Sequence, residues 1–176
     1  MKKLFLGVVL ALMLVATVAI AVPPADKATK ATNVMLYAKT PGTDIYNAWE
    51  IVLGGAWGKL NYDNSKFVFN GHGLVTGLDY SLISYEEPGL GNWPADVVIL
   101  GSGTADEFGD VHIMGLMQTP YCNDYTGYPT DAEYYNQHGA KIWLVLSSDL
   151  TGTQITGWTP TSYLFEDALI NVGCGA

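Results

Sequence analysis

The sequence contains no arginine, and its eight lysines stand against seventeen acidic residues, which gives a net charge of −9. Two of the lysines, Lys2 and Lys3, lie at the extreme N-terminus, and the other six are not clustered. Binding to a phosphate backbone or to an anionic membrane surface depends on clustered Lys and Arg side chains. The composition therefore argues against nucleic acid and anionic lipid as partners and predicts an acidic surface, which suits divalent cations.

Long apolar runs are absent after residue 21, whereas one such run precedes it. Lys2 and Lys3 are followed by an uncharged stretch over 4–20, and Ala19 and Ala21 are the small residues that a signal peptidase reads. This pattern predicts a cleaved secretory signal peptide rather than a permanent membrane anchor.

The expected domain organisation follows from that signal. We predict a signal peptide over 1–21, a linker rich in Pro, Ala, Thr and Lys over 22–33, and a single domain over 34–176. The mature protein should have no membrane span and should be secreted or held in the cell envelope on its extracellular side.

Cysteine is scarce, with only Cys122 and Cys174 in the chain. An even cysteine number in an exported protein predicts a disulfide bond. The bond would tie the C-terminal tail to the middle of the domain.

A long helical period with caps is also absent, and short strand-like runs take its place. Turn residues separate these runs, which predicts an all-β fold, an antiparallel β-sandwich of about eight strands that is Ig-like or jelly-roll-like. Residues 106–109 resemble the tip of a hairpin joining two of the runs. The runs cover 34–39, 49–53, 57–63, 66–70, 79–86, 96–105, 110–117, 140–148 and 162–170, the last being a strand or a short helix.

The stretch HIMGLMQTPYC over 112–122 raises the possibility of a soft-metal site. His112 and Met114 would share one face of a strand, and a Cys122 thiolate with these ligands would select copper. A cysteine in a disulfide cannot bind metal, so the preferred interpretation is a strand, a turn and a disulfide.

Acidic residues in two turns make calcium the more plausible metal. Calcium takes six to eight oxygen ligands from carboxylates, amides and backbone carbonyls. Asp106 and Asp110 flank one turn, and Asp124, Asp131 and Glu133 lie in a long loop. The alternative is that these carboxylates are solvated turn residues.

Exposed aromatic residues suggest glycan binding. Trp93 lies in a loop rich in Gly and Pro, and Tyr125, Tyr128 and Tyr134 lie in a long loop over 119–139. Aromatic rings beside Asp and Asn can stack on sugars and direct hydrogen bonds to them. The same rings could instead hold the loop against the domain.

Catalysis has weaker support in the sequence. Glu50, Glu86 and Glu87 are candidate carboxylates for a hydrolase, but a glycosidase requires two of them at a set separation. Gly101-Ser102-Gly103 lacks the Gly-x-Ser-x-Gly frame of a nucleophile elbow.

Several stretches together resemble a secreted β-sandwich domain of exported archaeal proteins, notably of methanogens. They are FVFNGHGLVTGLDYSLISYEEP, ILGSGTADEFGDVHIMG, GAKIWLVLSSDL and GWTPTSYLFE. The resemblance covers most of residues 56–170 and implies a secreted sandwich, with no catalytic residue carried over.

These observations predict an exported, non-catalytic binding or structural module of the cell surface or extracellular space, stabilised by calcium. One alternative is a carbohydrate-binding module that uses Trp93 and the Tyr-rich loop, and another is a secreted hydrolase. The expected partners are an extracellular glycan, an envelope protein or a second copy of the chain.

Overall fold

The computed structural model describes residues 32–40, 49–86, 93–124 and 137–174, so the predicted signal peptide and most of the predicted linker lie outside the described residues. Within these ranges the chain forms fourteen β-strands and two short 3-10 turns, with no α-helix. The same residues contain no helix long and apolar enough to cross a membrane.

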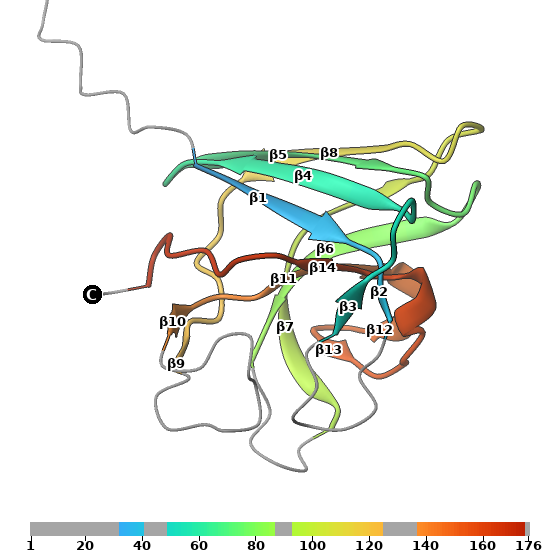
Figure 1. Ribbon diagram of the computed structural model, residues 1–176. Helices are drawn as coiled ribbons and strands as arrows, with labels where there is room; N and C mark the ends of the chain where they lie inside the picture. The colour runs from blue at the N-terminus through green and yellow to red at the C-terminus, as the bar shows by residue number, and fades with distance from the viewer. Residues whose placement is uncertain (1–31, 41–48, 87–92, 125–136, 175–176) are drawn as a thin grey trace, which may run out of the picture.

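Ten of the strands form one antiparallel sheet, and Figure 1 labels these strands. In sheet order they are β12 (Leu150–Thr151), β13 (Gln154–Ile155), β7 (Ala95–Thr104), β6 (Asp79–Tyr85), β11 (Ile142–Leu146), β14 (Leu164–Glu166), β1 (Thr32–Tyr37), β4 (Trp57–Tyr62), β5 (Lys66–His72) and β8 (Val111–Leu116). Two further pairs stand apart, β2 (Lys39–Thr40) with β3 (Glu50–Ile51) and β9 (Asn123–Asp124) with β10 (His138–Gly139). The 3-10 turns are η1 (Ser147–Asp149) and η2 (Pro160–Ser162).

The sheet curls into a half-barrel, which brings β7 and β8 face to face although seven steps of the strand order separate them. A Cβ atom placed on Gly101 of β7 would lie only 2.7 Å from Ile113 Cγ2 of β8. The two halves of the curled sheet therefore enclose a core as the layers of a sandwich do, and the predicted all-β antiparallel fold is confirmed.

Alternating side chains on the long strands fill the inside of the half-barrel. On β8, Val111 and Ile113 are buried, whereas His112 and Met114 point outward. This inner core also includes Val34, Leu36, Leu60, Phe67, Phe69, Tyr80, Leu82, Ile142, Leu144 and Leu164.

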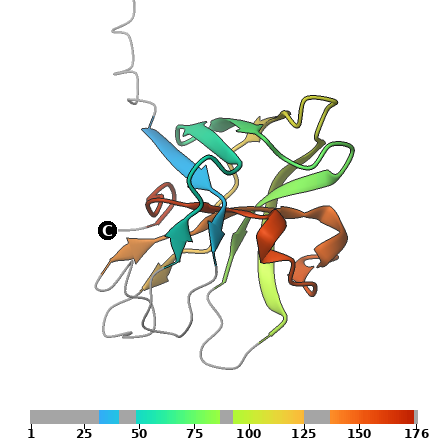
Figure 2. The same ribbon diagram turned by 45° about the vertical axis from the view of Figure 1, so that its right-hand side comes forward.

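A second, smaller core lies on the opposite face of the sheet. The β12–β13 hairpin and the segment up to η2 cover this face, beside β7 in both Figure 1 and Figure 2. The second core consists of Ile83, Tyr85, Ala95, Val97, Val145, Ile155, Tyr163 and Phe165. Strands β6, β11 and β14 are consequently buried on both faces.

Strand pairing differs from the sequence prediction at the turn over 106–109. The turn exists, since the Asp106 amide donates to the Asp110 carbonyl (2.9 Å) and the Gly109 amide to that of Asp106 (3.0 Å). The two strands that it joins do not form a hairpin ladder, because β7 pairs with β6 and β13 while β8 pairs with β5. The ambiguous run over 162–170 contains a short strand, β14.

Candidate functional site

An aromatic cluster covers the second core. Trp158 is at its centre, with ring centroids 5.9 Å from Trp49, 5.7 Å from Trp93, 5.8 Å from Trp143 and 5.6 Å from Tyr163. Phe165 and Tyr85 extend the cluster beneath Trp143, at 5.0 Å and 4.1 Å from its ring. Four of the five tryptophans of the chain thus meet on one face.

The outer edge of this cluster is exposed. Trp93 and Trp158 each keep 46% of their surface accessible, whereas Trp49 and Trp143 are half-buried beneath them. The Trp93 and Trp158 rings meet at 80°, edge to face. We call these two residues the indole pair, and their exposed surface is available for contact with a ligand.

Hydrogen bonds hold the segment that carries Trp158. The Asp149 carbonyl accepts from the amides of Thr156 (2.8 Å) and Gly157 (2.9 Å). The buried Tyr163 hydroxyl donates to the Asp149 carboxylate and accepts from the Thr159 amide (3.1 Å). Burial, and secondly the Asp149 carboxylate, raise the pKa of Tyr163, so the hydroxyl stays protonated and fixes the loop.

Polar groups at the start of β7 lie on the other face of the sheet from the indole pair. Asp96 follows Trp93 in the chain, and its carboxylate accepts from the Gln154 side-chain amide at 2.8 Å. Burial, followed by the Asp96 and Glu86 carboxylates, raises the pKa of Tyr121. The residues on either side of Asp96 belong to the second core, so alternation along β7 points the Asp96 carboxylate away from the aromatic cluster.

Sequence reasoning identified Trp93 but missed its partners. Trp158 lies in the turn-rich stretch GWTP, and Trp49 and Trp143 belong to predicted strands, so none stood out. Trp158, like Trp93, is a large aromatic residue among turn residues, and this pattern could have identified it as a candidate binding residue. Of the other predicted ligand-binding residues, Tyr125, Tyr128 and Tyr134 lie outside the described residues.

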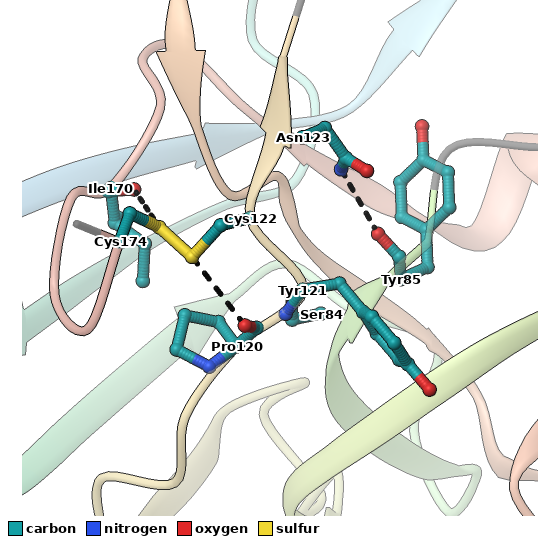
Figure 3. Close-up of a disulfide and its surroundings, with 8 residues drawn as sticks. All are labelled: Ser84, Tyr85, Pro120, Tyr121, Cys122, Asn123, Ile170 and Cys174. Carbon is teal, nitrogen blue, oxygen red and sulfur yellow. Dashed lines mark hydrogen bonds between the residues drawn. A yellow bond between two sulfur atoms is a disulfide. The ribbon is translucent and has the colours of Figure 1, made fainter. Parts of the chain in front are cut away.

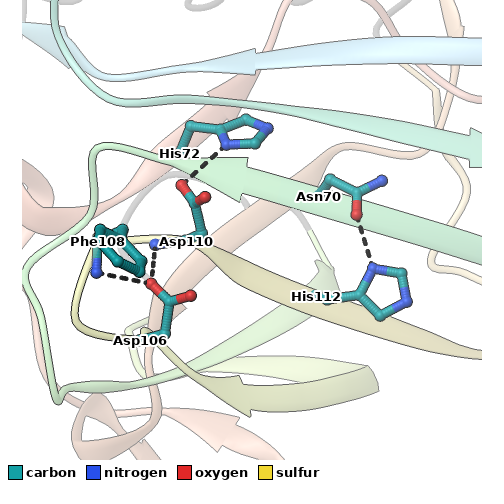
Figure 4. Close-up of polar contacts among 6 residues, drawn as sticks. All are labelled: Asn70, His72, Asp106, Phe108, Asp110 and His112. Atoms are coloured by element: carbon teal, nitrogen blue, oxygen red, sulfur yellow. Dashed lines mark hydrogen bonds and ion pairs between the residues drawn. The ribbon is translucent and has the colours of Figure 1, made fainter.

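The predicted metal ligands Asp106 and Asp110 already have protein partners, as Figure 4 shows. Asp106 Oδ1 accepts from the backbone amides of Phe108 and Asp110, both at 2.9 Å. Asp110 Oδ1 lies 2.9 Å from His72 Nδ1, and the His72 ring packs on Trp57 at 4.5 Å. These contacts hold the turn and the end of β5 in place.

The remaining acidic candidates belong to the long loop. Asp124 is exposed in the short strand β9, while Asp131 and Glu133 lie outside the described residues. Among the residues that the structure does describe, no three His, Cys, Asp or Glu side chains gather as a metal site.

Cys122 and Cys174 form the predicted disulfide, with Cα atoms 5.4 Å apart (Figure 3). The bond anchors the C-terminal segment to the chain just before β9, where the Tyr121 amide also donates to Ser84 Oγ at 3.0 Å. A disulfide sulfur cannot act as a thiolate ligand, which removes Cys122 from the copper hypothesis. His112 Nδ1 instead lies 2.6 Å from Asn70 Oδ1 (Figure 4). Met114 is exposed rather than packed in the core.

Of the three candidate hydrolase carboxylates, the structure describes two. Glu50 and Glu86 are both exposed, and Glu87 lies outside the described residues. A hydrolase therefore stays a sequence prediction.

The chain matches no known family model, no curated protein and no solved structure. The resemblance to exported archaeal domains likewise stays a prediction.

Proposed function

We propose that the chain is an exported, non-catalytic module that binds glycans through the indole pair. The observation that carries the proposal is the meeting of Trp93 and Trp158 at the exposed edge of a buried aromatic cluster. Two indoles with nearly half their surface in solvent contribute less to the core than buried ones would, whereas their faces suit stacking on sugar rings. Export is supported by the N-terminal sequence pattern and by the disulfide.

The angle between the two rings indicates which kind of glycan the indole pair could bind. A flat crystalline polysaccharide surface would need coplanar rings, but the indole pair meets at 80°. A single flexible chain can place one sugar on a ring face and turn the next toward the second indole. We therefore expect soluble oligosaccharides as ligands rather than crystalline faces.

The proposal is tested on a glycan array with the secreted chain, a Trp93→Ala variant and a Trp158→Ala variant. We expect the unmodified chain to bind a defined group of oligosaccharides and both variants to lose them. Trp57→Ala is the matched control, because Trp57 is also exposed (41%) but packs on His72 outside the cluster. An array without binding, or equal loss in the control, would reject the proposal.

We also propose that calcium binds to the long loop over 119–139 and stabilises the domain. The long loop contributes three of the five predicted acidic ligands, Asp124, Asp131 and Glu133, whereas Asp106 and Asp110 belong to a separate turn. Calcium at a hundred times its dissociation constant would add about 2.7 kcal/mol to the unfolding free energy. We expect the thermal midpoint to rise with calcium, and Asp131→Asn to remove the rise while Asp106→Asn keeps it.

An envelope protein or a second copy of the chain is the alternative partner. Such a structural subunit would form concentration-dependent oligomers, whereas the glycan-binding module should remain monomeric in sedimentation velocity experiments. A secreted hydrolase would instead release products from the array glycans, and Glu86→Gln would abolish that release.

A further inference from the structure

Three neighbouring turns carry apolar side chains at their tips. Leu53, Val75 and Phe108 are exposed by 95%, 54% and 77% in the turns over 51–56, 73–78 and 105–110. We call these three side chains the tip surface.

The three turns are joined by backbone contacts. The Leu74 amide donates to the Gly109 carbonyl at 2.9 Å, and the Gly77 amide to the Ala105 carbonyl at 2.8 Å. The turn over 51–56 contacts the second turn, because Ala56 lies close to Gly73. A Cβ atom placed on Gly73 would lie 3.4 Å from Ala56 Cα. The tips are therefore held in a fixed arrangement at one end of the half-barrel (Figure 1).

The local fold does not require apolar residues at these positions. The backbone needs of the turns are met by Gly54, Gly77 and Gly109, whose φ angles are 73°, 75° and 79°. Turn tips ordinarily carry Asn, Asp, Ser or Gly, which hydrogen-bond locally or face water. Leucine, valine and phenylalanine gain nothing there unless another apolar phase covers them.

The charges around the tips select the kind of surface that covers them. The three turns contain no Lys, and Asp106, Glu107 and Asp110 flank Phe108. An anionic lipid surface would repel these carboxylates, and so would a second copy presenting the same turns. A zwitterionic bilayer offers outward ammonium groups that complement the carboxylates and an apolar layer beneath them.

We propose that the tip surface docks on a zwitterionic lipid membrane, with Leu53, Val75 and Phe108 inserted below the headgroups. Separate projecting side chains fit a fluid layer, which deforms around each of them. This site is distinct from the indole pair, because Trp93 precedes β7 while Phe108 follows it, so the length of β7 lies between them. A membrane-docked chain could thus present the indole pair away from the lipid.

The test measures binding of the secreted chain to phosphatidylcholine vesicles by flotation. Mass spectrometry first determines the N-terminal residue of the secreted chain. We expect binding, and we expect Leu53→Ser and Phe108→Ser each to lower the partition coefficient about tenfold. Met114→Ser is the matched control, because Met114 is 64% exposed on β8 and outside the tips, and it should leave binding unchanged. All variants share the same N-terminal segment, so any contribution of that segment cancels in the comparison.

Other outcomes would overturn the proposal. One is the absence of binding to phosphatidylcholine vesicles, and another is an equal loss of vesicle binding in Met114→Ser. A third is stronger binding to vesicles that contain phosphatidylglycerol, with the same strength in the tip variants as in the unmodified chain. A dimer in sedimentation velocity that Leu53→Ser dissociates would assign the tip surface to a second copy instead. Glycan binding by the tip variants should persist, which separates this proposal from that for the indole pair.

Discussion

The indole rings of Trp93 and Trp158 meet edge to face, with centroids 5.7 Å apart, although one precedes β7 and the other follows β13. The antiparallel pairing of Gln154 with Asp96 and of Ile155 with Ala95 brings the two segments together. A feature of the fold, and not of any local motif, thus creates the candidate glycan site.

Removal of the Tyr163 hydroxyl should weaken glycan binding although both indole side chains are unchanged. Tyr163→Phe leaves the Asp149 carboxylate and the Thr159 amide without this partner and loosens the loop that carries Trp158. We expect a stability loss of about 1.5–3 kcal/mol, as for a hydrogen bond to a charged group, and a lower affinity. Tyr80→Phe is the control, since the buried Tyr80 hydroxyl accepts from the Val75 amide far from the indole pair, and it should lower stability alone. An unchanged affinity in Tyr163→Phe would contradict the positioning role.

Breaking the disulfide should destabilise the domain substantially. The Cys122–Cys174 bond closes a loop with a sequence separation of 52, which is worth about 4 kcal/mol in the chain-entropy model. Urea unfolding of the Cys122→Ser/Cys174→Ser double variant should show this loss, and reduction of the unmodified chain should match it. Equal stability of the oxidised and reduced chains would be inconsistent with the bond.

A methyl group at Gly58 should be poorly tolerated. The Phe69 ring lies over the cross-strand pair Gly58 and Gly71, and a Cβ on Gly58 would lie 2.3 Å from Phe69 Cζ. Gly58→Ala should therefore cost about 1–3 kcal/mol through overpacking. In the double variant with Phe69→Leu, the added methyl should cost less, and a purely additive double-mutant cycle would refute the clash.

Acid should weaken the turn between β4 and β5. Asp63 Oδ1 accepts from the Ser65 hydroxyl (2.7 Å), the Ser65 amide (2.8 Å) and the Lys66 amide (2.9 Å), and these bonds lower the pKa of Asp63. Because the pKa of Asp63 is lower in the folded chain, its stabilisation is fully present above the pKa of the unfolded chain, about 3.9. The stabilisation is lost as the pH falls through the pKa of the folded chain. The stability difference between the unmodified chain and Asp63→Asn should shrink below about pH 4. Glu107→Gln, another exposed carboxylate, should leave the acid transition in place.

The strands were predictable because alternation of side chains is a local property. Leu82 and Ile83 on β6 point to opposite cores, as alternation along the predicted strand over 79–86 requires. Strand partners were not predictable from adjacency, because the curl of the sheet places β7 and β8 face to face without a ladder. Trp93 was recognisable from its loop, whereas Trp158 became a site residue only through the long-range pairing of β13 with β7.

The most direct test of the account is calorimetric titration of the secreted chain with the soluble oligosaccharide that binds best on the array. We predict that Trp93→Ala and Trp158→Ala each lower the affinity by about 2 kcal/mol, or roughly thirtyfold, as for aromatic residues at binding hot spots. Thermal midpoints recorded alongside should show that both variants remain folded. Full affinity in the folded variants, or a loss equally large in Trp57→Ala, would contradict the assignment of the indole pair as the glycan site.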